Sequence, residues 1–322
     1  MSDDMKTCVI LDDYQDVALT FADWKILADR VTVTRLTEHL ADQDELVARI
    51  GDADIIVMMR ERTRFPAQLF RRLPRLRLLV TSGMRNAAID LAAAAAAGVV
   101  VCGTASDSTP PMELTWGLIL GLARQIQAEN TQLRQNGPWQ STIGVDLKGS
   151  RLGIVGLGKI GTQIARIGQA FGMHVAAWSA NLTQERATAA GVEMAASKEA
   201  LLENSDFVTI HLVLAPATRG TIGTAELRRM KRSAFLINTS RAEIVDQPAL
   251  IQALEDKRIA GAGLDVFDTE PLPPDHPFRR LPNVLATPHL GYVARNNYRA
   301  YFTEAVQDIE AWLAGSPIRT LG

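Results

Sequence analysis

The chain has 322 residues, 47% hydrophobic and 22% charged, and 34 Lys and Arg against 36 Asp and Glu give a net charge of −2. This composition is typical of a globular protein with room for two domains. The near-neutral balance provides no basic surface for nucleic acid or an anionic membrane.

No targeting or membrane segment is predicted. The N-terminal residues lack the apolar core of a signal peptide, and no apolar run approaches the ~20 residues that span a bilayer. Cys8 and Cys102 lie in strand-like runs without a CxxC motif, which favours buried free thiols over a disulfide or a metal site. We therefore expect a cytoplasmic protein with no membrane partner, no nucleic-acid partner and no metal.

Short β-branched runs alternate with helical patterns over the first hundred residues, which predicts a parallel sheet with crossover helices. Helices such as Asp44–Ile50 and Leu91–Ala97 are expected between the strands. The alanine-rich second one is predicted as a helix because Ala is the strongest helix former and Gly98 suits the position just after its end. The expected strands are Thr7–Leu11, Val31–Leu36, Ile55–Met59, Leu78–Thr81 and Val99–Cys102.

A long amphipathic helix is predicted over Met112–Asn136, after a Ser-Thr-Pro-Pro start that suits a first helical turn. A second alternating series then begins, and a last helix over Tyr292–Ala314 follows it. Because the second sheet is complete before this helix, we expect the helix to return to the first domain. The second set of strands is Leu152–Val155, His174–Trp178, Phe207–Leu212, Ala234–Asn238, Gly263–Val266 and Val284–Ala286.

Residues 151–161 read Arg-Leu-Gly-Ile-Val-Gly-Leu-Gly-Lys-Ile-Gly, an apolar strand that runs directly into a GxGxxG motif and a helix-forming stretch. Gly156 permits a tight turn, Gly158 lets the backbone approach a pyrophosphate, and Gly161 lets helix and strand pack closely. The phosphates then lie at a helix N-terminus, where free N–H groups favour negative charge. GxGxxG alone also occurs in structural turns, but the strand before it and the helix after it favour a dinucleotide site.

The second strand of this unit ends in Trp178-Ser-Ala-Asn181, where NAD-binding domains usually carry an acid for the ribose 2′-OH. No Asp or Glu occurs from Gly161 until Glu185. Ser179 and Asn181 suit a hydroxyl or a phosphate, or Ser179 is simply a polar strand end, and the nearest Arg is Arg186. The sequence therefore predicts NAD or NADP without a preference.

Three polar side chains follow later strands, where ligands of open α/β sheets bind. Reduction of a ketone by hydride needs a cation for the substrate, an acid for the alkoxide and a group that orients this acid. Arg241 has the planar fork that matches a carboxylate, His289 provides an imidazole acid, and Glu270 would favour its protonated form. Taken singly, Arg241 also suits a surface ion pair and Glu270 a turn before Pro271. The remaining histidines outside strand ends, His39, His174 and His276, are predicted to be structural or exposed.

Four ordered motifs carry a family resemblance: Gly-Leu-Gly-Lys-Ile-Gly from 156, Asn-Thr-Ser-Arg-Ala-Glu-Ile-Val-Asp from 238, Leu-Asp-Val-Phe-Asp-Thr-Glu-Pro-Leu-Pro from 264, and Thr-Pro-His-Leu-Gly-Tyr from 287. Together they resemble the D-isomer-specific 2-hydroxyacid dehydrogenases, a family with glyoxylate and hydroxypyruvate reductases and phosphoglycerate dehydrogenases. The resemblance implies two doubly wound parallel-sheet α/β domains, a Rossmann cofactor domain (106–291) inserted into a flavodoxin-like substrate domain (1–105 and 292–322). It implies reversible, NAD(P)-dependent reduction of small 2-oxo acids to D-2-hydroxy acids, with His289 as general acid and base.

The resemblance also implies the site residues. The family's catalytic Arg, Glu and His fall on Arg241, Glu270 and His289. Its carboxylate-binding loop falls on 81–86, where the backbone N–H groups of Ser82, Gly83 and Met84 would hold the substrate together with Arg241. The chain departs from the family pattern at Ser179, at Val213 in place of Pro, and at Ala242 in place of Gly. The implied cofactor contacts are Gly156, Gly158, Lys159, Ile160, Gly161, Ser179, Leu212, Val213, Thr218, Thr239, Ser240, Asp265 and Thr109.

Other functions fit parts of the pattern. Some transcriptional corepressors resemble the same family, so a nucleotide-sensing interaction protein is an alternative, as is a phosphite dehydrogenase-like enzyme. Formate dehydrogenases resemble the pattern with Gln beside the His, and the ionisable Glu270 favours alcohol–ketone chemistry instead. GxSxG and HExxH motifs are absent from the sequence, which argues against a serine hydrolase or a zinc peptidase. Family members commonly dimerise through the helix that matches Met112–Asn136, so a homodimer is expected.

Overall fold

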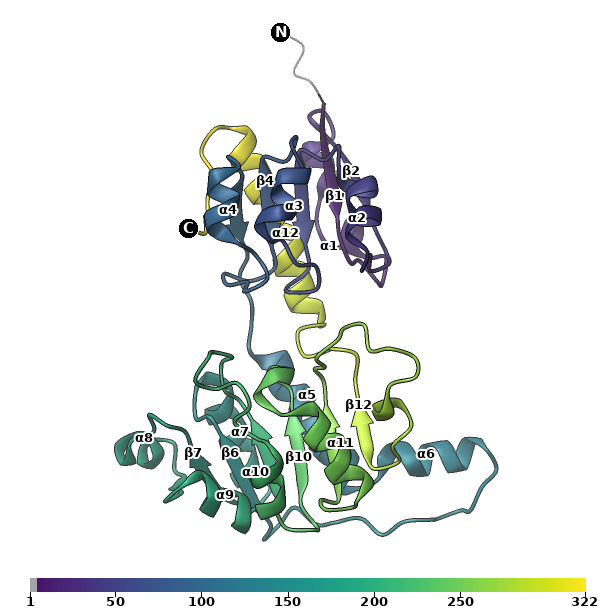
Figure 1. Ribbon diagram of the computed structural model, residues 1–322, viewed down its shortest axis with the longest axis vertical. Helices are drawn as coiled ribbons and strands as arrows, with labels where there is room; N and C mark the ends of the chain where they lie inside the picture. Colours follow the sequence, from purple (N-terminus) through teal and green to yellow (C-terminus); the bar gives the residue numbers. More distant parts are fainter. Residues whose placement is uncertain (1–4) are drawn as a thin grey trace. The chain divides into compact units, whose positions relative to one another are not determined.

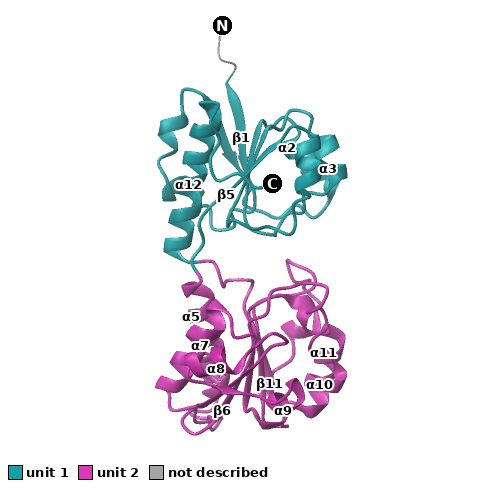
Figure 2. Cartoon of the chain, turned by 90° about the vertical axis from the view of Figure 1, so that its left-hand side faces the viewer, with its two compact units in different colours: residues 1–107, 294–322 teal, residues 108–293 magenta. Residues whose placement is uncertain are grey.

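The computed structural model describes residues 5–322; the first four, part of the segment in which no signal peptide is predicted, lie outside the described residues. Two compact units make up the chain (Figure 2). Unit 1 consists of the described residues up to Asp107 together with Ala294–Gly322, and unit 2 consists of Ser108–Val293. Unit 2 is thus inserted into the sequence of unit 1, to which the last helix belongs. No helix in the described part of the chain is long and apolar enough to cross a membrane.

Unit 1 contains one parallel sheet in the order β2-β1-β3-β4-β5, which is the 2-1-3-4-5 order of flavodoxin-like folds. The sheet lies between α2 and α3 on one face and α12 on the other (Figure 2). Strands β3 and β4 are buried along their whole length, so they read as continuous apolar runs and not as an alternating pattern. The elements are β1 Lys6–Ile10, α1 Ala18–Phe21, the 3-10 helix η1 Trp24–Leu27, β2 Val31–Arg35, α2 Gln43–Ile50, β3 Ile55–Met58, α3 Ala67–Arg72, β4 Leu78–Thr81, α4 Leu91–Ala96, β5 Val100–Gly103 and α12 Arg295–Leu313.

Three residues on one face of helix α12 form hydrogen bonds with residues 105–107, the end of the first segment of unit 1. Glu304 Oε2 accepts a hydrogen bond from the Ala105 N–H at 2.7 Å, and the hydroxyls of Tyr301 and Ser106 share one at 2.9 Å. Asn297 Oδ1 accepts from the Asp107 N–H, also at 2.9 Å. Their spacing of four and then three residues aligns them on the helix surface. The helix therefore fixes the chain residue by residue up to the point where unit 2 begins.

Unit 2 also has an all-parallel sheet, in the order β12-β11-β10-β9-β6-β7-β8 (Figure 1). From β6 the chain runs outward through β7 and β8, and then returns to continue through β9 to β12, which is the doubly wound dinucleotide-binding arrangement. The two parallel-sheet α/β domains predicted from the sequence are confirmed. The elements are α5 Thr109–Ala123, α6 Ile126–Arg134, β6 Arg151–Val155, α7 Lys159–Ala170, β7 His174–Trp178, α8 Gln184–Ala189, β8 Glu193–Met194, α9 Lys198–Asn204, β9 Phe207–Ile210, α10 Thr224–Arg229, β10 Phe235–Asn238, η2 Ala242–Ile244, α11 Gln247–Glu255, β11 Gly261–Leu264, η3 Pro277–Arg279 and β12 Val284–Ala286.

The single amphipathic helix predicted over Met112–Asn136 is wrong. The segment forms two helices, because Gln125 takes a left-handed conformation with φ 52° and interrupts the hydrogen-bond ladder. Helix α5 is not amphipathic: most of its second half is buried, and it packs against α7, β10 and β11. Helix α6, by contrast, buries none of its residues. The short edge strand β8 was not predicted, and β11 begins two residues earlier than expected.

Candidate active site

Because every strand of unit 2 runs parallel to its neighbours, the loops that follow the strands lie at one edge of the sheet. The glycine loop follows β6, Ser179 follows β7, and Leu212 comes two residues after β9. Arg241 lies beyond β10, Asp265 directly after β11, and His289 three residues after β12. The fold therefore collects at this edge the sequence-predicted residues that follow the strands of unit 2.

The glycine loop has the geometry that a dinucleotide pyrophosphate needs. Gly156 has φ +105°, and a Cβ there would lie 2.7 Å from the carbonyl oxygen of His211. A Cβ on Gly161 would lie 2.2 Å from the carbonyl oxygen of Gly156, so helix α7 packs too closely for a side chain. A Cβ on Gly158 would meet no atom within 4 Å. Open space therefore faces the second glycine, directly before Lys159 and Ile160 open α7, and it suits a phosphate group.

The residues after β9 and β10 form one hydrogen-bonded surface beside the glycine loop. The Thr218 hydroxyl donates to the carbonyl oxygen of Val213 at 2.7 Å and closes the loop after β9. The Ser240 hydroxyl donates to the carbonyl oxygen of Leu212, which ties that loop to the end of β10. The structure thus brings four of the expected cofactor contacts together. Thr239 lies next to them, and its hydroxyl shares a hydrogen bond of 2.7 Å with that of Thr115 in α5, the helix that Thr109 opens.

Burial keeps one imidazole under this surface neutral. His211 lies directly after β9, and its Nε2 is 2.9 Å from the Thr209 hydroxyl. Burial lowers the pKa of His211 to about 3, because a charged ring there would lose its hydration. His211 is therefore not a proton donor at neutral pH.

Asp265 shapes the loop that carries His289. Its Oδ1 accepts hydrogen bonds from the Thr287 hydroxyl and the Leu290 N–H, both at 2.7 Å, and its Oδ2 accepts from the Gly291 N–H at 2.8 Å. Burial raises the pKa of the Asp265 carboxyl, and the Thr287 hydroxyl opposes this shift. Asp265 was predicted only as a cofactor contact. In the structure it also bonds to the Thr287 side chain before His289 and to the backbone N–H groups after it, so it holds the loop around His289, whose φ of 53° is left-handed.

Glu270 and His289 form a direct pair. Glu270 Oε2 lies 2.6 Å from His289 Nδ1, although the two residues are 19 positions apart in the sequence. The other carboxylate oxygen, Oε1, accepts from the Phe267 N–H at 2.9 Å and so fixes the orientation of the carboxylate. An ionised carboxylate only accepts, so Nδ1 carries a proton and the Nε2 atom is left for a reactant.

The buried side-chain amide of Asn238 holds the backbone at Arg241 through hydrogen bonds. Asn238, the last residue of β10 and 2% exposed, donates through Nδ2 to the carbonyl oxygen of Arg241 at 3.0 Å and accepts from the Ser240 N–H at 3.0 Å. These bonds bend the chain sharply after the strand. The Arg241 Nη1 donates to the carbonyl oxygen of Ser240 at 2.7 Å, which orients the guanidinium. Because β10 and the β11–β12 pair are neighbours in the sheet, Arg241 shares their edge with the Glu270–His289 pair.

The carboxylate loop predicted over 81–86 lies in unit 1, after β4, and the structure corrects part of that prediction. The Ser82 N–H donates to the carbonyl oxygen of Met58 at 3.2 Å and continues the sheet, so it is not available to a substrate. The Gly83 N–H donates to the Thr104 hydroxyl at 3.1 Å. Within the described residues, only the Met84 N–H of the three has no hydrogen-bond partner.

Sequence reasoning missed one cation at the same loop. Arg60 follows β3, and its Nη1 donates to the carbonyl oxygen of Ser82 at 3.3 Å. A Cβ on Gly83 would lie 2.3 Å from this nitrogen, so the guanidinium rests directly on the loop. The rule that ligand-binding residues follow parallel strands, which selected Arg241, also selects Arg60 once it is applied to the first sheet.

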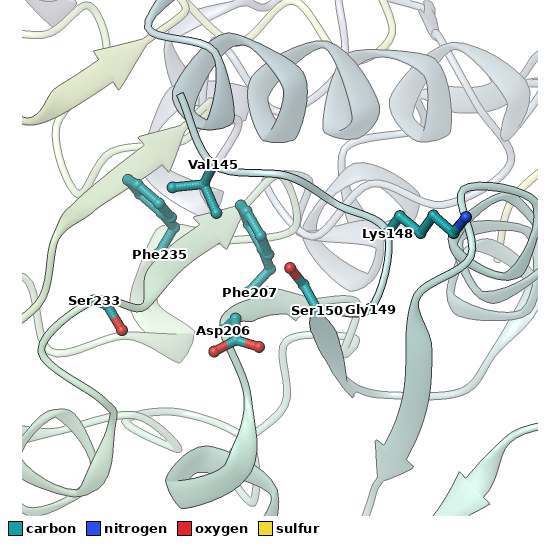
Figure 3. A pocket seen from close by; sticks show the side chains of 8 residues that line it. All are labelled: Val145, Lys148, Gly149, Ser150, Asp206, Phe207, Ser233 and Phe235. Carbon is teal, nitrogen blue, oxygen red and sulfur yellow. The ribbon is translucent and has the colours of Figure 1, made fainter. Parts of the chain in front are cut away.

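A cavity of about 400 Å³ in unit 2 does not coincide with these residues (Figure 3). Its lining includes Ser150, Asp206 and Phe235, which stand at the amino ends of β6, β9 and β10. That is the opposite edge of the sheet from the glycine loop, so the cavity takes no part in the candidate site. Within residues 5–322 no three His, Cys, Asp or Glu side chains gather as a metal site requires.

A doubly wound sheet with a glycine loop and a carboxylate–imidazole pair at one edge defines a dinucleotide-dependent oxidoreductase. The model of the NAD-binding domain of D-isomer-specific 2-hydroxyacid dehydrogenases matches residues 116–291. The chain belongs to the D-isomer-specific 2-hydroxyacid dehydrogenase family, whose dehydrogenases and reductases act on a CH–OH group with NAD(P).

Individual relatives agree with this membership. The chain is 37% identical to a glyoxylate reductase of Korarchaeum cryptofilum over 76% of this chain and 75% of that enzyme. It is 34% identical to a D-3-phosphoglycerate dehydrogenase of Methanocaldococcus jannaschii over 85% of this chain but only 52% of that enzyme, so it spans about half of that relative's length. A solved phosphoglycerate oxidoreductase from Vibrio cholerae superimposes with a TM-score of 0.92 at 34% identity, covering 97% of this chain and 100% of that one.

Proposed function

We propose that this protein reduces small 2-oxo acids to D-2-hydroxy acids, reversibly, with NADH or NADPH. The observation that carries the proposal is the Glu270–His289 pair at 2.6 Å, at the sheet edge where the glycine loop opens. An imidazole with one nitrogen fixed by a carboxylate is suited to give or take a proton at the other. A reversible alcohol–ketone reaction requires that transfer.

The residues divide the chemistry between them. A nicotinamide dinucleotide held at the glycine loop would supply the hydride that the carbonyl carbon of the oxo acid requires. Protonated His289 gives its Nε2 proton to the carbonyl oxygen, so that with the added hydride the C=O group becomes CH–OH. The imidazole is then neutral, and its remaining proton stays on Nδ1, hydrogen-bonded to Glu270. Arg241 offers two parallel N–H groups to the substrate carboxylate and stabilises the charge that develops on the neighbouring oxygen. In the reverse direction neutral His289 takes the alcohol proton.

We assign the cofactor contacts to the glycine loop and to the surface formed by Leu212, Val213, Thr218, Thr239 and Ser240. The open space at Gly158 supports a pyrophosphate there. Within unit 1, the Met84 N–H and the neighbouring Arg60 guanidinium are groups that can bind an anion.

The experiment is a panel assay of the purified protein. Oxidation of NADH and of NADPH is followed at 340 nm with glyoxylate, hydroxypyruvate, pyruvate and larger 2-oxo acids, and the chirality of each product is determined. We expect turnover with at least one small oxo acid and a D-configured product. Cofactor binding without turnover over the whole panel would instead support a nucleotide-sensing interaction protein. NAD⁺ reduction by phosphite would support the phosphite dehydrogenase alternative.

Glu270→Gln is expected to lower kcat for oxo acid reduction by about tenfold or more. Glutamine keeps the size of the side chain but removes the carboxylate whose Oε2 lies 2.6 Å from His289 Nδ1 and orients the ring. Steady-state rates with saturating cofactor test this, with Glu255→Gln, an exposed residue at the end of α11, as the matched control. Wild-type turnover in Glu270→Gln would show that the carboxylate does not orient the imidazole.

We also propose a homodimer formed through α6 and the segment after it. Ile126 and Leu133 on this helix are 55% and 57% exposed, and Trp139 and Ile143 beyond it are 81% and 97% exposed. Such a run of exposed apolar side chains is typical of an interface. Light scattering after gel filtration gives the mass, which should be twice that of the chain.

A cytoplasmic location is part of the same proposal. Cys8 and Cys102 are both free and both buried in the sheet of unit 1. Disulfides characterise oxidising compartments, and buried thiols are the usual form in the cytoplasm. Fractionation of the producing cells tests the location.

A further inference from the structure

One cation of unit 2 bridges the glycine loop and the end of the second strand. Arg186, in α8, donates through Nη2 to the carbonyl oxygen of Leu157 at 2.9 Å and through Nη1 to that of Asn181 at 3.2 Å. Leu157 lies between the first two glycines of the GxGxxG motif, and Asn181 lies three residues after β7. The guanidinium is thus held by two backbone carbonyls from the two loops that flank a bound adenosine.

The position of Arg186 bears on whether the cofactor carries a 2′-phosphate. In doubly wound folds the loop after the second strand meets the adenosine ribose, where an acid binds a free 2′-OH and an Arg nearby accommodates a 2′-phosphate. A guanidinium has five N–H donors, and the two carbonyls engage one donor on each terminal nitrogen. Further donors therefore stay available for a phosphate at the same place.

The carboxylate closest in sequence is engaged at the start of α8. Glu185 bonds to its own backbone N–H and to the Thr183 hydroxyl, at the start of α8. These hydrogen bonds lower the pKa of Glu185, so the carboxylate is ionised and engaged by the helix terminus. The end of β7 itself carries Ser179 and Asn181, which are neutral hydrogen-bonding residues.

We propose that this site binds the 2′-phosphate of NADP(H), so that the protein prefers NADP(H) to NAD(H). Arg186 supplies the cation, and Ser179 and Asn181 supply hydrogen bonds to the phosphate oxygens. The inference rests on the proposed dinucleotide-dependent function and adds the cofactor preference, which the sequence leaves open.

Binding of adenosine fragments tests the proposal without catalysis. Calorimetry compares 2′,5′-ADP with 5′-AMP, and NADP⁺ with NAD⁺, on the full chain. We expect 2′,5′-ADP to bind about tenfold or more tightly than 5′-AMP, as charge-assisted hydrogen bonds to a phosphate imply. Arg186→Ala should remove this difference, so that 2′,5′-ADP and 5′-AMP bind with similar affinity. Arg232→Ala, an exposed cation at the opposite edge of the sheet, should behave as the wild type.

Removing Arg186 also removes its hydrogen bond to the glycine loop, so a second variant that keeps this bond is needed. Ser179→Asp leaves the Arg186 bonds in place and adds a charge that repels a 2′-phosphate, so it should weaken NADP⁺ binding and spare or improve NAD⁺ binding. Equal affinities of the wild type for 2′,5′-ADP and 5′-AMP would overturn the cofactor preference alone. If none of the nucleotides binds, the proposed function falls with it.

Discussion

His289→Ala is expected to lower kcat for 2-oxo acid reduction by about 100- to 10,000-fold, the usual contribution of a positioned general acid. The variant removes the only proton donor that the Glu270 carboxylate orients at this edge of the described sheet. Without it, the developing alkoxide must take its proton from water. Steady-state rates with saturating cofactor and a panel oxo acid measure the effect.

Cofactor binding separates a chemical defect from a folding defect. The glycine loop and the surface around Leu212 do not depend on the imidazole, so the dissociation constant of the reduced cofactor should change less than about threefold, since no hydrogen bond to the cofactor is removed. His174→Ala is the matched control, because His174 opens β7 at the opposite edge and is exposed. Turnover at the wild-type rate in His289→Ala would eliminate the role of this imidazole as proton donor.

Arg241→Ala is expected to reduce kcat/KM for the oxo acid by about 100-fold or more, because two charge-assisted hydrogen bonds at ~1.5–3 kcal/mol each are removed. Cofactor affinity should again be preserved. The loss should appear in kcat as well as in KM, because the guanidinium also stabilises the transition state at the carbonyl. Kinetics over a range of oxo acid concentrations separate the two parameters.

Arg241→Lys tests whether the substrate carboxylate needs the two parallel hydrogen bonds of a guanidinium or only a positive charge. Lysine retains the positive charge but cannot donate two parallel hydrogen bonds, so kcat/KM should lie between those of the wild type and Arg241→Ala. Arg232→Ala serves as the surface-charge control here too. If Arg241→Ala keeps the wild-type kcat/KM, the substrate carboxylate is bound by other groups.

Local patterns were sufficient for most of the fold. A strand followed by GxGxxG has few stable alternatives, because the glycine positions are dictated by backbone clashes that the structure shows at Gly156 and Gly161. The alternation of apolar runs and helical periods likewise predicted both parallel sheets. The strand-end rule selected Arg241 and His289, since it depends only on strand direction.

Contacts between distant segments were beyond those patterns. The break between α5 and α6 depends on a left-handed Gln125, a conformation that no local preference of glutamine predicts. The Ser82 N–H was assigned to a substrate although it extends the sheet toward Met58. The strand-end rule is able to select Arg60, but the contact of its guanidinium with the carbonyl oxygen of Ser82, more than twenty residues away, is visible only in the structure.

The type of chemistry was predictable from the amino acids alone, because the residues that carry it are recognisable from their side chains and from the strands they follow. The folded chain was needed to show that Asp265 holds the loop around His289, that Glu270 fixes its Nδ1, and that Arg186 joins the glycine loop to the end of β7. Each of these depends on hydrogen bonds between segments brought together by the order of strands in the sheet. Strand order is set by packing of whole helices and strands, and spacing along the chain does not encode it.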